Sequence, residues 1–424
     1  ADRARLPASY QGQAVEDAYP LSMLQQAMWF HSLQDPSLSL YIDVVTYRLA
    51  MAWDAVRVQD CLDYLVRKHA VLRTVFLRQG GQYCQLVKAA HPVQVRHIDC
   101  GGTPHGERRA VVARWVEAEK QRGIAALDEL WRMTAHEFDG ETVQLTFVVH
   151  HAIMDGWSVA ALYAELCALV ALHAAGKPLP AIVMPPAHQH FVALEQRALQ
   201  DGGAYWKNAF GDARLPWWTG AAKTPSVRVF CEVTDEDAAC IAALCHRLKV
   251  SERSIWCAVY LALVATLSGT RDVSAGVVTH GRPEIADAAH TLGLFLNTLP
   301  VRVKLEASWE QLIVDTSAAL ERLYGQRHYP LAQVQVDTGL DFSATLFNYT
   351  NFHVQNEVDA SQEGGFDENN FLLSLNVRKD DNRQRFYCAV NLEPTLFDAA
   401  FAARIQGYVG NILGALRSPG HKAD

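Results

Sequence analysis

The sequence lacks several features that would indicate particular classes of protein. None of its nine cysteines forms a Cys-x-x-Cys pair, and its N-terminus has no signal-peptide pattern. It also has no charge-free apolar run of about 18 residues, the length a membrane-spanning helix needs. We therefore expect reduced cysteines, no membrane partner and a cytoplasmic protein.

The sequence also lacks an excess of positive charge: 38 lysines and arginines stand against 46 aspartates and glutamates, so the net charge is −8. This gives no support for nucleic acid as a partner. Half of the residues are hydrophobic and a fifth are charged, which is typical of globular proteins. With 424 residues the chain exceeds one ordinary core, so two domains are expected. The ends, Ala-Asp-Arg and His-Lys-Ala-Asp, suggest a piece cut from a longer polypeptide.

Four segments, among others, have the pattern of a helix. The first is 21–33, with Ser22 as a possible N-cap, and the second is 55–69, which follows Asp54. The third is 157–175. The fourth, 254–267, is apolar all round and is therefore expected to be buried.

Strand and helix patterns alternate along the chain, which predicts the α/β class. The segment 177–186 carries four prolines and follows a predicted helix that Gly176 ends. It is the expected linker between an N-terminal domain, 1–176, and a C-terminal domain, 187–424. Similar patterns on both sides predict two lobes of related architecture.

The most informative segment follows the apolar run Val143–Val149, where His150 and His151 stand side by side before Asp155-Gly156. Histidine exchanges a proton near neutral pH because its unperturbed pKa is about 6.5. Neighbouring residues on a strand face opposite sides, so only one of the two histidines can face a cavity. The spacing alone does not decide which one.

This His-His-x-x-x-Asp-Gly pattern resembles the core motif of condensation domains of nonribosomal peptide synthetases. It resembles, more loosely, the wider chloramphenicol acetyltransferase superfamily. Four further segments resemble the first, second, fifth and sixth blocks of the condensation family, in the same order along the chain. The family's fourth block is only partly kept, in His190–Glu195 with Tyr205-Trp206. The four segments are Leu21–Trp29, Arg67–Phe76, Leu292–Leu299 and His328–Leu331.

The resemblance implies an α/β fold of two chloramphenicol-acetyltransferase-like lobes, arranged as a V-shaped pseudo-dimer with the active site where the lobes meet. The implied reaction joins an acyl thioester to the amine of a carrier-bound aminoacyl thioester. The implied partners are peptidyl carrier protein domains, an acyl-CoA or acyl carrier protein donor, and adjoining synthetase domains. Substrates would arrive on phosphopantetheine or coenzyme A, with no cofactor or metal bound by the domain itself.

The resemblance also assigns roles to residues. It places His151, Asp155 and Gly156 in the catalytic motif, with His151 facing the reaction channel either as a base or as a group that orients the amine. Asp155 could cap the next helix, pair with an arginine in the other lobe, or do both. Substrate-binding or structural roles at the site are expected for His150, Trp157, Ser158, Arg282 and Asn297.

Departures from the family pattern bear on the donor. The block Phe342–Tyr349 lacks the arginine that usually precedes Pro-Leu-Phe. The combination of Ala152–Ser158 with Leu346–His353 is similar to starter condensation domains, which attach an acyl group to the first amino acid. The alternatives are an ordinary elongating peptidyl domain, a non-catalytic carrier-docking module and a free-standing acyltransferase. Epimerisation and heterocyclisation domains fit the motif less well. The spacing of His150, His151 and Asp155 matches no standard zinc pattern.

Overall fold

A computed structural model of the chain describes two compact units. One comprises the described residues of Ala1–Ala193, Arg282–Phe295 and His353–Glu368, and the other those of Leu194–Gly281, Leu296–Phe352 and Asn369–Asp424. We call them unit 1 and unit 2 and describe each by itself. The structure describes residues 9–10, 12–34, 39–49, 51–79, 81–124, 129–218, 224–305, 308–351, 362–364, 371–380 and 384–417.

This division differs from the expected boundary. The proline-rich segment 177–186 falls within unit 1, which extends to Ala193. The segment Arg282–Phe295, expected in the second lobe, also belongs to unit 1. Its backbone bonds to the start of the helix after the histidine pair, for example from the Asp155 N–H to the Gly293 carbonyl at 3.0 Å. Such a return of the chain depends on contacts between distant residues, which a linear pattern does not reveal.

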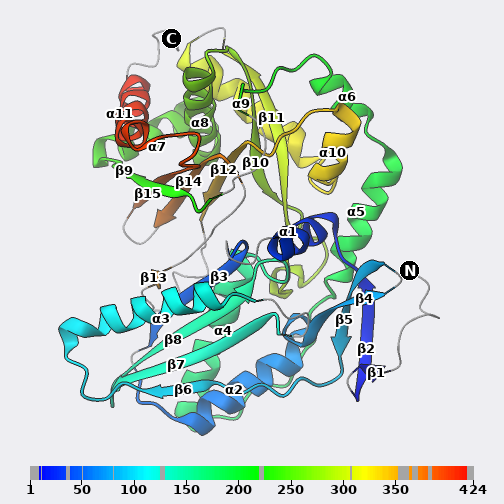
Figure 1. Cartoon of the computed structure of the whole chain (residues 1–424), viewed down its shortest axis with the longest axis vertical. Helices are drawn as coiled ribbons and strands as arrows, with labels where there is room; N and C mark the ends of the chain where they lie inside the picture. The colour runs from blue at the N-terminus through cyan, green and yellow to red at the C-terminus, as the bar shows by residue number, and fades with distance from the viewer. Residues whose placement is uncertain are drawn as a thin grey trace. The chain divides into compact units, whose positions relative to one another are not determined.

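Unit 1 contains a five-stranded sheet in the order β13-β3-β8-β7-β6 and a four-stranded sheet in the order β1-β2-β5-β4 (Figure 1). Every residue of β8 after Thr142 is buried, so both faces of the larger sheet are covered there. The strands are β1 Ser9–Tyr10, β2 Gln13–Pro20, β3 Ile42–Leu49, β4 Thr74–Gln79, β5 Gln82–Lys88, β6 Arg96–Asp99, β7 Trp131–Asp139, β8 Thr142–His150 and β13 Gln362–Gly364.

The helices of unit 1 cover the larger sheet. Helices α2 and α4 pack against each other, and α3 contacts β3 and β8. The predicted helix starts are confirmed where the structure shows a cap: Asp54 accepts the Arg57 N–H at 2.9 Å, and Ser22 accepts the Gln25 N–H at 3.2 Å. The helices are α1 Met23–Gln34, α2 Ala55–Lys68, α3 Arg108–Arg122 and α4 Gly156–Ala174, and α5 Gln189–Asp201 runs from unit 1 into unit 2.

Among the described helices, α4 is long and apolar enough to cross a membrane, and α7 with α8 would qualify only as one pair bent by 111°. Eight residues of α4 are buried, and its first turn is bonded to the segment Arg282–Phe295. These contacts are those of a core helix.

Unit 2 is built on a six-stranded sheet in the order β11-β10-β12-β14-β15-β9, in which β12 runs parallel to both neighbours. The predicted all-apolar helix is confirmed as α8, whose residues from Ser254 to Val264 are all buried. The elements are α6 Ala204–Phe210, β9 Val227–Cys231, α7 Asp235–Leu248, α8 Glu252–Ser268, β10 Asp272–His280, β11 Leu296–Lys304, α9 Trp309–Tyr324, α10 Leu331–Thr338, β12 Thr345–Thr350, β14 Leu373–Asp380, β15 Arg385–Leu392 and α11 Ala399–Leu416.

Candidate functional site

The two adjacent histidines lie where strand β8 ends. β8 pairs antiparallel with β3, so that Ile42 stands opposite His150 and Asp43 opposite Val149. His150 is completely buried, whereas the His151 side chain, one residue beyond the strand, keeps 15% of its surface exposed. The two rings therefore occupy different environments, as the alternation of side chains along a strand requires.

His150 is held inside unit 1 by hydrogen bonds on both ring nitrogens. The Ala152 N–H donates to Nδ1 at 3.1 Å, so Nε2 carries the proton and donates to Ser32 Oγ at 3.0 Å. The Trp29 ring lies against it, with centroids 5.1 Å apart. Burial lowers the pKa of His150 to about 3, so the ring is neutral at physiological pH. This environment is that of a structural residue.

Helix α1 links the first family-like block, Leu21–Trp29, to the histidine pair. Ser22 and Gln25 bond each other reciprocally at the start of α1, because the Ser22 N–H donates to Gln25 Oε1 at 2.9 Å while Ser22 Oγ caps Gln25. The Gln25 amide then donates to the Ala152 carbonyl at 2.9 Å. The block thus fixes the backbone directly after His151.

The His151 ring is oriented by two oxygen atoms near Nδ1. Nδ1 donates to the Met154 carbonyl at 2.9 Å, and Oδ2 of Asp43 lies 3.0 Å from the same nitrogen. Both oxygens carry lone pairs, so the proton of the neutral ring is on Nδ1 and the basic lone pair is on Nε2. The His151 N–H bonds the Tyr41 carbonyl at 2.7 Å. Tyr41 adopts φ of 61°, a left-handed conformation that is strained for an aromatic residue and is held here by its surroundings.

Asp155 acts as the cap of α4 and also pairs with arginine. Its Oδ1 accepts the Ser158 N–H at 2.8 Å and lies 3.3 Å from a guanidinium nitrogen of Arg282, while Oδ2 accepts the Phe295 N–H at 3.2 Å. Both roles left open by the sequence are therefore present. Because these donors occupy the carboxylate, the geometry favours a structural role for Asp155 over proton transfer. Both residues of the pair belong to unit 1, whereas the expectation placed Arg282 in the other lobe.

Ser158 and Arg282 complete the same network. Ser158 Oγ donates to the Gly293 carbonyl at 2.9 Å and accepts from the Gly293 N–H at 3.1 Å and from Arg282 at 2.9 Å. Arg282 also donates to the Thr291 carbonyl at 2.6 Å, and its guanidinium lies 4.2 Å from the centroid of the Phe295 ring. The Ser158 hydroxyl is thus committed to this network, which corresponds to the structural one of the two roles expected for it.

The remaining expected site residues lie in two places. Gly156 and Trp157 are the first residues of α4 and are half-buried. Asn297 lies on β11 in unit 2, is buried, and donates to the carbonyls of Arg327 at 3.1 Å and Tyr329 at 2.7 Å. Its amide therefore fixes the segment around His328–Leu331 instead of being presented to substrate.

The sequence interpretation missed two residues of this region. Asp43 is the carboxylate beside His151; a lone acidic residue inside the apolar strand Ile42–Leu49 was a signal that could have found it. His188 donates from Nε2 to the Leu294 carbonyl at 2.8 Å, and burial lowers its pKa to about 4. A Cβ at Gly293 would lie 2.5 Å from the His188 ring, so glycine allows this close packing. No local pattern marks His188.

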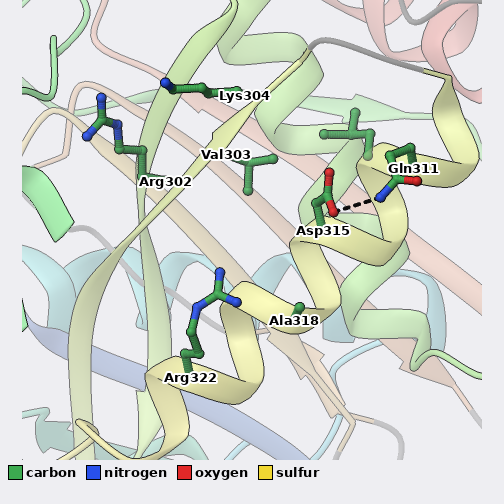
Figure 2. A pocket seen from close by; sticks show the side chains of 8 residues that line it. Arg302, Val303, Lys304, Gln311, Asp315, Ala318 and Arg322 are labelled. Carbon is green, nitrogen blue, oxygen red and sulfur yellow. Dashed lines mark hydrogen bonds between the residues drawn. The ribbon is translucent and has the colours of Figure 1, made fainter.

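Two other features bear on ligand binding. Within the described part of the chain, no three His, Cys, Asp or Glu side chains are grouped as metal ligands. A cavity of about 380 Å³ lies in unit 2, between β11 and α9. Its lining includes Arg302, Lys304, Asp315 and Arg322, which Figure 2 shows. It includes none of the motif residues.

Comparison with known proteins agrees with this geometry. The family model for the condensation domain matches residues 15–422. The chain belongs to the condensation-domain family. Condensation domains are amide-bond-forming acyltransferases of nonribosomal peptide synthesis, and the expected α/β class and family are confirmed.

The curated relatives are long synthetases. The condensation domain is 31% identical over 381 residues to the AMB antimetabolite synthetase AmbE of Pseudomonas aeruginosa, and the match covers 86% of this chain and 17% of the relative. It is 23% identical over 424 residues to tyrocidine synthase 3 of Brevibacillus parabrevis, and that match covers 94% of this chain and 6% of the relative. The chain thus spans less than a fifth of the length of these relatives.

Solved structures show the same fold at low identity. The condensation domain of the monacolin K polyketide synthase MokA superposes with a TM-score of 0.81 at 16% identity, covering 97% of this chain and 100% of that one. The starter condensation domain of rhizomide synthetase RzmA, solved with C8-CoA, gives a TM-score of 0.79 at 15% identity, and 96% of each chain is covered. At this level of identity the likeness concerns the fold alone.

Proposed function

We propose that this condensation domain joins an acyl thioester to the amine of a carrier-bound aminoacyl thioester, with His151 as the proton acceptor. The observation that carries the proposal is the arrangement around Nδ1 of His151, where two oxygen acceptors hold the proton and leave the basic lone pair on Nε2. The partly exposed ring contrasts with its buried neighbour His150.

The proton transfer follows from the chemistry of the bond that forms. The neutral amine attacks the thioester carbonyl, and the resulting zwitterionic intermediate must lose an ammonium proton before it collapses. Nε2 of His151 accepts that proton, the C–S bond breaks, and the amide forms as the thiolate leaves. His151 then returns the proton to the thiolate, so no metal or redox partner is required. Proximity of the two bound thioesters supplies a large share of the rate.

The donor proposed first is a fatty or other acyl starter, delivered on coenzyme A or on an acyl carrier protein. The support is the missing arginine in Phe342–Tyr349, a segment whose described residues contribute no cationic side chain. Of the starter-like segment Leu346–His353, Phe352 and His353 lie outside the described residues. An elongating peptidyl donor is the second candidate, favoured by the tyrocidine and gramicidin S synthases among the relatives.

A non-catalytic carrier-docking role is the candidate from another class. It would not require an imidazole with a defined tautomer at the end of β8. The ordered His151 ring and the intact Asp155 network therefore favour an enzyme.

The donor class can be tested directly with the acceptor on a peptidyl carrier protein. Acetyl-, hexanoyl-, octanoyl- and dodecanoyl-CoA are competed with one aminoacyl carrier, and the carrier is read by intact mass. A chain binds through apolar area, at about 0.8 kcal/mol for each buried methylene. Amide formation should therefore rise with chain length until the pocket is filled and then fall.

His151→Ala serves as the inactive control in this assay. Reaction with a peptidyl carrier but with no acyl-CoA and no acyl carrier protein would replace the starter function with elongation. If neither donor class gives an amide product, the non-catalytic carrier-docking role replaces the proposed enzyme activity.

A further inference from the structure

The acidic side chain beside His151 belongs to a different strand, β3. Asp43 stands opposite Val149 across the β3–β8 pair, and His151 is two residues beyond Val149. Such diagonal neighbours lie on one face of a sheet and within reach of each other. The Asp43 side chain keeps 12% of its surface exposed and the His151 side chain 15%. The carboxylate therefore approaches Nδ1 in a region with little water.

We propose that Asp43 is a positioning residue for His151, which helps to keep the ring proton on Nδ1 and stabilises the imidazolium formed when Nε2 accepts the substrate proton. The inference rests on the proposed function of His151 and deepens it. It assigns Asp43 no contact with substrate.

The contribution of Asp43 is mainly its charge. The Met154 carbonyl accepts the Nδ1 proton at 2.9 Å, so the ring would favour this tautomer even without the charge of Asp43. Oδ2 of Asp43, at 3.0 Å, adds a negative charge that favours the charged ring over the neutral one. A carboxylate with little solvent is costly unless a positive group balances it. The imidazolium is that group, so the pair is best balanced when the proton has been taken up.

The other ionisable groups near His151 do not compete with this effect. His150 lies on the opposite face of β8 and is neutral, because burial lowers its pKa to about 3. Asp155, four residues after His151 in the chain, is balanced by Arg282 at 3.3 Å. Asp43 Oδ2, at 3.0 Å from Nδ1, therefore bears directly on the charge of the ring.

The pH dependence of the rate separates this role from a purely structural one. Asp43→Asn keeps the size of the side chain and removes its charge. We expect kcat to fall by about tenfold or more, KM to stay near the wild-type value, and the acidic limb of the pH–rate profile to move to lower pH by about one unit. Asp43→Ala should lose more rate than Asp43→Asn, because Asn still offers an oxygen acceptor.

A matched control comes from the same unit. Glu137 on β7 lies 3.0 Å from His97 Nε2, so it forms a histidine–carboxylate pair of equal length outside the motif. Glu137→Gln should leave both kcat and the pH profile unchanged. A shift in this control equal to that in Asp43→Asn would assign the effect to overall charge and overturn the proposal.

Nitrogen NMR of the histidine rings gives a readout that does not depend on activity. In the wild type the His151 ring should carry its proton on Nδ1 when neutral, and its titration midpoint should fall in Asp43→Asn. In a His151→Ala background, Asp43→Asn should cause no further loss of rate.

The outcomes separate the two proposals. If His151→Ala abolishes amide formation while Asp43→Asn leaves the rate, the pH profile and the ring titration unchanged, the role of Asp43 is overturned and the proposed function stands. If the wild type forms no amide with any donor, the proposed function fails, and the ring titration still decides whether Asp43 controls His151.

Discussion

At the scale of single residues, two neighbouring histidines differ because of where their rings lie. His150 is sealed in the core with both nitrogens bonded, and His151 stands past the strand end with its proton held on Nδ1. The same residue type thus serves packing in one position and, in the proposed function, proton transfer in the next. The difference comes from burial and hydrogen-bond partners, not from the chemistry of the side chain.

Alanine substitutions should separate these roles. His151→Ala should reduce amide formation by about 100-fold or more, because it removes the proton acceptor, and should change the melting temperature little. His150→Ala should lower the melting temperature, because it leaves a cavity and removes the ring that donates to Ser32 Oγ. Single-turnover rates with saturating carriers and thermal unfolding give the two readouts. Full single-turnover activity in His151→Ala would exclude the general-base role.

At the scale of elements, the start of helix α4 is tied to the segment Arg282–Phe295. Asp155 and Ser158 on the helix side bond the backbone of Gly293 and Phe295 and the guanidinium of Arg282. The histidine-bearing turn is therefore held by α1 on one side, through Gln25, and by this returning segment on the other. The aspartate of the motif, Asp155, therefore has three structural tasks: it caps α4, pairs with Arg282 and binds the backbone of the returning segment at Phe295.

A double-mutant cycle measures the ion pair in this network. Asp155→Asn and Arg282→Met should each destabilise the protein, by about 3–5 kcal/mol, because each leaves a buried group without its partner. The double variant should lose less than the sum, giving a clear coupling energy in urea unfolding. The exposed pair Arg247–Glu310 is the control, with an expected coupling of about 0–1 kcal/mol. Equal coupling in the two cycles would reduce Asp155 to a helix cap.

At the scale of the whole molecule, stability depends on histidines that are buried in the neutral form. Burial lowers the pKa of His150 to about 3 and that of His188 to about 4, against 6.5 for the free side chain. Between about pH 6.5 and 4 the unfolded chain therefore binds more protons than the folded one. Stability contributed by these rings is present above pH 6.5 and is lost as the pH falls through this window.

We expect the urea midpoint to fall between pH 7 and pH 5, with each ring accounting for about 2 kcal/mol of the loss. His150→Gln and His188→Gln should each reduce the pH dependence, although both variants start from a lower stability at pH 7. Carboxylates contribute separately to acid unfolding, so the comparison between variant and wild type isolates the histidine share. An unchanged slope in both variants would show that these rings are not neutral in the folded state.

Local patterns in the sequence were enough to predict helices, strands, helix caps and the family. Apolar periodicity located α2, α4 and α8, and Ser22 and Asp54 marked helix starts, because caps and periodicity depend on residues within one or two turns. Strand alternation required that His150 and His151 face different ways. The motif with its four companion segments indicated the condensation family, and the family-model match over residues 15–422 confirms it.

The tertiary structure alone decided what depends on contacts between distant residues. It showed which histidine is buried, placed Asp43 beside His151 through strand register, and brought Arg282–Phe295 into unit 1. It also showed that the Ser158 hydroxyl and the Asn297 amide are committed to backbone partners. Strand register and the return of Arg282–Phe295 bring together residues that are more than a hundred positions apart in the sequence. The free energy that favours these contacts comes from burial of side chains throughout the unit, so no local segment of the sequence determines them.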